Sequence, residues 1–126
     1  MLTRRSLIAA LTTGAALTPF AAQAHHGYMR WDEDNPIAIE GWVSKEMDGF
    51  PHWEIDVRVD GEDWEVDLGD QWTLQKAGLK DDGSDFTVRR QIRVEGLRPA
   101  DYSILRVLPS RIILDSDKVY DIEVRG

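Results

Sequence analysis

The stretch "WEIDVRVDGEDWEVDLG", residues 53–69, decides the fold of this chain. Apolar residues occupy every second position on both sides of its centre, and charged residues stand between them. This alternation is typical of β-strands that bury one face. The Asp60-Gly61 dipeptide at the centre is a common sequence for a tight hairpin turn. The stretch therefore predicts two antiparallel strands, 53–59 and 64–68.

The residues on either side of this hairpin extend the pattern. Residues 37–44 alternate in the same way and predict the first strand. After the hairpin the period changes in "DQWTLQKAG", where Asp70 suits a helix N-cap and Gly78 suits a helix end. We expect one short helix between these two residues.

The last third of the chain returns to strand patterns. Residues 88–95 alternate and predict the fourth strand. The stretches "YSILRVLPSRIIL" and "KVYDIEV" predict the last strand and a terminal ribbon, with Pro109 interrupting their pairing. Three strands, a short helix and then two or more strands match an OB-type barrel. The predicted fold class is all-β with small α content: a five-stranded OB-like barrel over 37–126, with one short helix between strands three and four.

The N-terminus has the three parts of a signal peptide. Arg4 and Arg5 precede an apolar run, and small residues follow up to Ala24. We predict a signal over 1–24 and a mobile N-terminal arm over 25–36. The segment "TRRSLI" resembles the twin-arginine export signal, with Leu7 in place of the usual Phe, and ordinary secretion stays open as a route. The mature protein is expected in the periplasm or outside the cell, with no membrane insertion after cleavage.

Cleavage after Ala24 removes 24 of the 126 residues and leaves 102, which suits one small domain. It removes two arginines and no acidic residue, so the formal net charge changes from −8 to −10. Nucleic acids and anionic membranes attract basic proteins, so neither is an expected partner. The chain has no cysteine, which excludes thiol chemistry.

Histidines are scarce, and two of the three lie at the predicted mature N-terminus. They are His25 and His26, and the third is His52, before the second strand. An N-terminal histidine offers a metal two nitrogens, its free amine and its Nδ1. Both lose their protons readily near neutral pH. A set of such nitrogens suits Cu(II) best, so we predict a copper site formed by all three histidines.

Other chemistry has weaker support in the sequence. The acidic runs "WDEDN" and "KDDGSD" lack the ligand spacing of an EF-hand loop. No serine lies in a nucleophile elbow, and no glycine pattern fits a phosphate-binding loop. A hydrolase or a nucleotide site is therefore not expected.

Several segments together resemble a known family. They are "HHG", "IAIEGWV", "PHWEIDV", "WEVDLG" and "LQKAG". They resemble a small exported bacterial family catalogued as domain of unknown function 6152, whose members begin with His-His and carry Asn-Pro-His before the second strand. The resemblance runs from His25 to about Gly96 and implies that the histidines act together. The matching positions are His25, His26, Gly41, Pro51, His52, Trp64 and Gly78. Phe50 stands where the family usually has Asn, and "TVRRQ" replaces a Gly-Asp before the fourth strand.

The leading hypothesis is an exported, non-enzymatic protein that captures or delivers copper through His25, His26 and His52. The alternative is a periplasmic OB-type module that binds a small molecule or a protein partner without a metal. A copper redox enzyme ranks third, because a domain of this size offers no evident acid next to the metal and no substrate platform.

Overall fold

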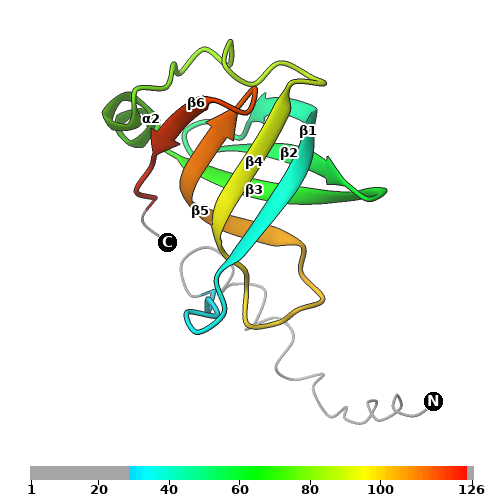
Figure 1. The fold of residues 1–126 in the computed structure, drawn as a ribbon. Helices are drawn as coiled ribbons and strands as arrows, with labels where there is room; N and C mark the ends of the chain where they lie inside the picture. The colour runs from blue at the N-terminus through cyan, green and yellow to red at the C-terminus, as the bar shows by residue number, and fades with distance from the viewer. Residues whose placement is uncertain (1–28, 125–126) are drawn as a thin grey trace, which may run out of the picture.

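Six strands and one short helix make up the part of the chain that the computed structural model describes, residues 29–124 (Figure 1). Five strands close into a barrel, and the helix lies between the third and fourth strands. The predicted OB-like, all-β fold is confirmed. In chain order the elements are β1 (Ile37–Asp48), β2 (Trp53–Val59), β3 (Glu62–Gly69), α2 (Gln71–Ala77), β4 (Gln91–Leu97), β5 (Arg106–Leu114) and β6 (Lys118–Asp121).

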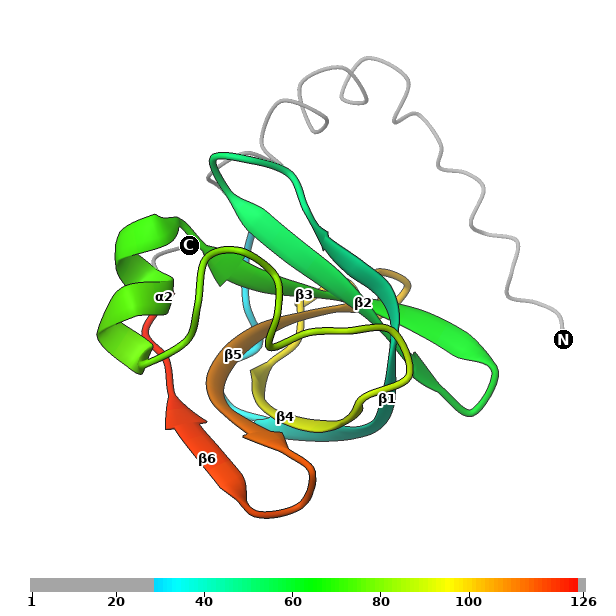
Figure 2. The ribbon, with the colours of Figure 1, turned by 90° about the horizontal axis from the view of Figure 1, so that it is seen from above.

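The strands follow the order β3-β2-β1-β4-β5-β6, and a further pairing of β3 with β5 closes the barrel. All neighbours are antiparallel except β3 and β5, which run parallel. This closing seam is short, because it pairs only Glu65 with Arg106 and Val66 with Val107. The view along the barrel shows the ring of strands with α2 outside it (Figure 2).

The decisive hairpin forms as its sequence predicts. β2 and β3 pair from Val59 and Glu62 at the turn to Trp53 and Gly69 at the far end. The turn residues Asp60 and Gly61 have φ values of 49° and 83°. A two-residue turn with two positive φ angles has a twist that matches the right-handed twist of the paired strands. Asp and Gly adopt such angles more readily than most residues.

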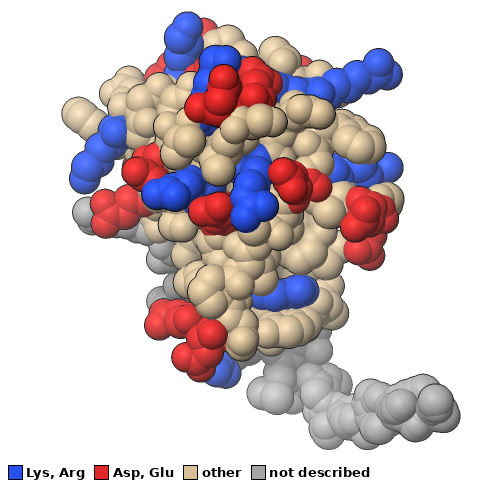
Figure 3. Space-filling view, viewed as in Figure 1, with Lys and Arg blue, Asp and Glu red and all other residues tan. Residues whose placement is uncertain are grey.

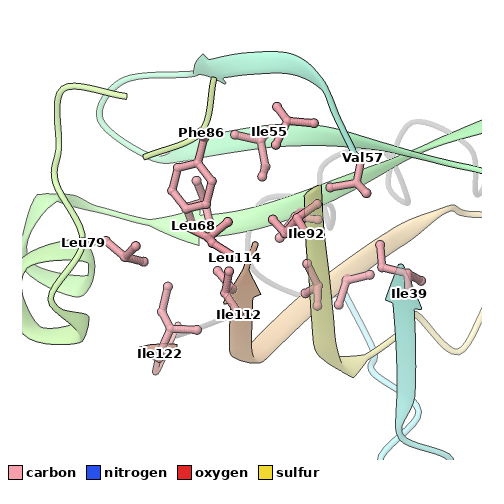
Figure 4. Close-up of a cluster of buried hydrophobic side chains, with 14 of the residues drawn as sticks. Ile39, Ile55, Val57, Leu68, Leu79, Phe86, Ile92, Ile112, Leu114 and Ile122 are labelled. Carbon is pink, nitrogen blue, oxygen red and sulfur yellow. The ribbon is translucent and has the colours of Figure 1, made fainter. Parts of the chain in front are cut away.

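The alternating apolar residues meet inside the barrel (Figure 4). Phe86, from the loop between α2 and β4, is fully buried with them. Burial of this apolar surface is the main force that holds the barrel together. The core consists of Ile39, Val43, Ile55, Val57, Val66, Leu68, Leu74, Leu79, Phe86, Ile92, Val94, Val107, Ile112, Leu114 and Ile122.

Both predicted ends of the helix are confirmed. The Asp70 carboxylate accepts a hydrogen bond of 2.9 Å from the Thr73 N–H, which caps the first turn. Gly78 ends the helix in the left-handed conformation, with a φ of 88°. The helix buries Leu74 against the barrel and leaves its other face exposed.

One detail of the predicted strands is wrong. The fourth strand begins at Gln91 rather than at residue 88, because Arg89 has a φ of 78°, which no extended strand allows. The predicted irregularity at Pro109 is present in the pairing, although β5 itself runs through this residue. A register shift between Glu95 and Gly96 lies opposite Pro109, so the pairing accommodates a residue without an N–H.

The surface of the barrel mixes charges of both signs. On the face seen in Figure 3, acidic and basic side chains alternate instead of forming one continuous patch. Within residues 29–124, no helix is long and apolar enough to cross a membrane. The predicted signal segment, 1–24, lies outside the described residues.

Candidate functional site

His52 lies in the turn between β1 and β2, and its side chain is exposed. The turn is held by a 2.9 Å hydrogen bond from the His52 N–H to the Gly49 carbonyl oxygen, and it contains a cis peptide bond before Pro51. Gly49 has a φ of 99°, and a Cβ there would lie 2.7 Å from the His52 carbonyl oxygen. Glycine is therefore required at this position to present His52.

A groove of about 620 Å³ separates the His52 turn from helix α2. Trp72, on the exposed face of α2, borders this groove and is 78% exposed. The groove therefore combines an imidazole, an indole and carboxylates. Its lining consists of His52, Gly69, Asp70, Trp72, Thr73, Gln75, Lys76 and Glu123.

The charged groups of this groove differ in how firmly they are held. The N–H of Thr73, followed by its hydroxyl, lowers the pKa of Asp70 below its usual value, and His52 adds a smaller effect of the same sign. Glu123 forms only a long, exposed ion pair of 3.8 Å with Lys76. Exposed pairs of this kind contribute little to stability. Asp70 therefore belongs to the helix cap, whereas Glu123 can turn toward a ligand.

Of the three predicted copper ligands, the structure describes only His52. His25 and His26 lie outside the described residues. Among residues 29–124, no three side chains of His, Cys, Asp or Glu lie together in a way that could hold a metal ion.

Part of the predicted mobile arm is fixed to the barrel, which corrects our expectation for residues 30–32. We call these residues the strap. The Asp32 N–H donates to the Arg98 carbonyl oxygen, and the Ala100 N–H donates to the Arg30 carbonyl oxygen, both at 2.8 Å. Trp31 also forms an antiparallel bridge with Pro99. The strap is thus attached to the loop between β4 and β5 by two backbone hydrogen bonds and one isolated bridge.

A cluster that the sequence patterns did not reveal lies on the outer face of the closing seam. Arg106 of β5 donates hydrogen bonds to Glu54 at 3.0 Å, to Glu65 at 2.8 Å and to Asp67 at 2.6 Å and 3.0 Å. The Arg106 side chain is 23% exposed. The alternation places the three carboxylates on one outer face, but only the pairing of β3 with β5 brings Arg106 among them. We call these four residues the Arg106 cluster.

Within the Arg106 cluster, the acidity of Glu54 is strongly changed. The pKa of Glu54 is raised to about 7, first by burial and then by the neighbouring Glu65 carboxyl, whose effect outweighs the opposite effect of Arg106. One Arg cannot neutralise three carboxylates, so the cluster favours a proton on Glu54.

The two acidic runs have structural roles. Asp32 accepts hydrogen bonds from the Asp34 N–H two residues on, from the Asn35 side chain and from the Tyr102 hydroxyl. Asp82 accepts from the N–H and the hydroxyl of Ser84. Asx turns of this type are common in loops and do not indicate a cation.

No family model matches the chain, and a search of curated proteins finds no similar sequence. The resemblance of residues 25–96 to the exported family therefore stays a prediction.

Proposed function

We propose that the protein is a small exported metal-binding protein that captures or delivers copper. The ligands are the amine and imidazole of His25 and the imidazoles of His26 and His52. The free amine exists only after cleavage at Ala24, so the precursor lacks one ligand. Copper is the cargo of the protein rather than a catalyst.

The exposure of His52 is the observation that carries this proposal. A histidine that is buried and hydrogen-bonded serves the fold, but His52 is exposed at the border of a groove. Within residues 29–124, its imidazole has no hydrogen-bond partner. Neutral imidazole nitrogens suit Cu(II), and the acidic protein favours a cation.

The location follows from the N-terminal sequence. An arginine pair, an apolar run and a small-residue cleavage site support export to the periplasm or the exterior. In both compartments the processed amine of His25 is available to metal ions. This part of the proposal is tested by the mass of the protein isolated from the periplasm.

A copper titration tests the ligand set. We compare processed protein that begins at His25 with the same protein carrying an acetyl group on its N-terminal amine. Acetylation converts the His25 amine into an amide and removes one chelate ring, and it creates no new metal-binding terminus. We expect Cu(II) affinity to fall by about tenfold or more, which corresponds to about 1.4 kcal/mol. Equal, weak binding by both forms would exclude the proposed site.

A second function has an observation in its favour. Trp72 is among the most exposed large apolar side chains of the described residues, and it borders the same groove. Exposed aromatic side chains are common where proteins bind ligands or partners. The alternative is therefore a periplasmic module that binds a small molecule or a protein partner without a metal. Affinity capture from periplasm separates the two functions, because the alternative predicts the same partners with and without a chelator.

A further inference from the structure

A hollow of about 480 Å³ lies on the outer face of the barrel, over β1, β4 and the turn between β5 and β6. Figure 1 shows β1, β4 and β5 side by side, and Figure 3 shows this face of the molecule from the same direction. The volume falls within the usual range of small-ligand sites, about 300 to 1,000 Å³. We call this site the Trp42 hollow. Its lining includes Glu40, Trp42, Gln91, Arg93, Ile113 and Ser116.

Trp42 forms the apolar platform of the hollow. The next residue, Val43, is fully buried, so the alternation of β1 directs the Trp42 side chain outward, where it is 48% exposed. In the sheet register Trp42 stands opposite Gln91 of β4 on one side and Arg58 of β2 on the other. Its indole therefore offers a flat apolar surface directly beside polar side chains.

The polar side chains of the hollow combine donors and acceptors with little net charge. Nη1 of Arg93 lies 3.8 Å from Oε1 of Glu40, and Nε of Arg93 donates to Glu95 at 3.0 Å. The side chains of Glu40 and Arg93 are 74% and 40% exposed, so both can still bond to a ligand. Gln91 adds an amide oxygen that accepts and an amide nitrogen that donates.

This combination favours an uncharged ligand with many hydroxyl groups. An apolar ligand would cover Glu40, Gln91 and Arg93 without replacing their hydrogen bonds to water, which costs free energy. A charged ligand would meet a like charge on either Glu40 or Arg93. An extended peptide cannot add to this face as a new strand, because β1 and β4 are each paired on both sides. A saccharide fits, because its hydroxyl groups both donate and accept and the C–H face of its ring can pack on an indole.

The turn between β5 and β6 adds an independent observation. Its central residues, Asp115 and Ser116, have φ values of 54° and 72°. The second position of such a turn favours glycine, because a side chain at positive φ is strained. Arg90 donates to the Asp115 carboxylate at 2.8 Å and 3.2 Å and so fixes the turn. Serine at a position suited to glycine costs conformational energy and brings a hydroxyl group to the hollow.

We propose that the Trp42 hollow binds a neutral oligosaccharide. The Trp42 indole packs on the C–H face of one sugar ring. Glu40, Gln91 and Arg93 form hydrogen bonds with the hydroxyl groups at the edge of the ring, and the Ser116 hydroxyl forms another. The hollow shares no lining residue with the groove beside His52, so this inference does not depend on the copper proposal.

The test is a titration of the processed protein, followed by amide chemical shifts in a buffer that contains a metal chelator. The probes are four neutral trisaccharides: cellotriose, mannotriose, galactotriose and triacetylchitotriose. We expect at least one to bind at millimolar concentration and to shift the amides of Gln91, Ile113 and Ser116. Binding of none of the four would overturn the inference.

Two charged probes test the claim that the ligand is neutral. Deacetylated chitotriose is the cationic counterpart of triacetylchitotriose, and trigalacturonate is the anionic counterpart of galactotriose. We expect each charged probe to bind more weakly than its neutral counterpart. Tighter binding of either charged probe would contradict a site for a neutral saccharide.

Three variants locate the bound saccharide. Trp42→Ala removes the platform and should weaken binding of the best trisaccharide by about tenfold or more. Gln91→Ala should weaken it by about fivefold, which corresponds to the loss of one hydrogen bond. Phe50→Ala is the matched control, because Phe50 is an aromatic residue that is 75% exposed on the turn between β1 and β2, and it should leave the affinity unchanged. Unchanged affinity in Trp42→Ala would overturn the inference.

Ser116→Gly separates binding from folding. Glycine relieves the positive φ angle, so Tm should be at least as high as that of the unmodified protein, while the saccharide affinity falls by about fivefold. Unchanged affinity in this variant would also contradict the site.

Light scattering tests a different occupant of the same face, a second copy of the chain. We expect the unmodified protein and Trp42→Ala to have the same molecular mass in solution. A dimer that Trp42→Ala converts to a monomer would make the hollow an interface between copies and would overturn the saccharide proposal.

Discussion

The Arg106 cluster and the His52 groove use their polar side chains in opposite ways. In the cluster, every carboxylate is hydrogen-bonded to one guanidinium that is 23% exposed. In the groove, His52 is exposed and its imidazole has no partner among the described residues. Paired, half-buried charges hold two strands together, whereas an exposed imidazole beside an exposed indole is available to a ligand. Arg106 and its carboxylates therefore stabilise the barrel, whereas His52 can bind a ligand.

Arg106→Met should produce the largest change in stability. It leaves three neighbouring carboxylates without their counter-charge and removes the side-chain link across the short seam between β3 and β5. Removal of one partner from a fully buried ion pair typically lowers stability by about 3 to 5 kcal/mol. Because this cluster is partly exposed, we expect a loss of about 2 kcal/mol in the free energy of unfolding, measured by urea denaturation.

A matched control for Arg106→Met lies on β2. Arg58 pairs with Asp63 on the same outer face, but this pair is exposed and does not cross the seam. Arg58→Met should change the urea midpoint much less than Arg106→Met does. If both variants lost the same stability, the seam would not depend on Arg106.

Glu54 gives the cluster a pH dependence of predictable sign. Its pKa is about 7 in the folded protein against 4.5 without the fold, so the folded protein binds the proton more tightly. The resulting stabilisation is complete below pH 4.5 and is lost as the pH rises toward 7. The pKa values of Asp63 and Asp115 are lowered, so these groups stabilise the folded protein above pH 3.8. Their contribution is lost only as the pH falls below that value.

Glu54→Gln tests this sign. The glutamine cannot ionise, so the stability of the variant relative to the unmodified protein should rise between pH 5 and 8, as measured from Tm at each pH. Asp56, whose pKa is also raised, remains in both proteins and cancels in the comparison. A stability difference that stayed constant over this range would contradict the raised pKa of Glu54.

His52→Asn should separate binding from stability. His52 is exposed, and substitutions at such surface positions usually change stability by less than about 0.5 kcal/mol. Loss of one imidazole ligand should lower Cu(II) affinity by about tenfold, measured by competition with a chelator. A large loss of stability with unchanged copper affinity would instead assign His52 to the scaffold.

Trp72→Phe should have the smallest effect. The side chain is 78% exposed, so its replacement should leave Tm unchanged. Because Trp72 and His52 border the same groove, Cu(II) bound at His52 should quench the Trp72 indole. The variant should therefore lose part of the copper-dependent fluorescence quenching while its copper affinity stays the same. Equal quenching in both proteins would mean that copper binds elsewhere.

Local sequence patterns predicted most of this fold for physical reasons. The alternation in β2 and β3, the Asp60-Gly61 turn and the caps at Asp70 and Gly78 each depend on residues close together in the chain. The predicted start of β4 was wrong, because Arg89 has a positive φ angle of 78° that the alternating pattern around it does not indicate.

Contacts between distant segments could not be predicted. The Arg106 cluster forms only because β3 pairs with β5. The strap is in place only because Trp31 forms a bridge with Pro99 of the loop between β4 and β5. The groove beside His52 depends on where α2 packs, which the alternation of single strands does not specify. His52 itself was identified from the scarcity of histidine, and the structure adds that it is exposed.

The most direct test of the copper proposal is the intact mass and copper content of the protein isolated from the periplasm after growth with copper. The account predicts a chain that begins at His25 and retains one Cu per molecule, and a His52→Asn protein from the same growth that retains less. A chain that begins at another residue, or a His25 chain isolated without copper, would contradict it.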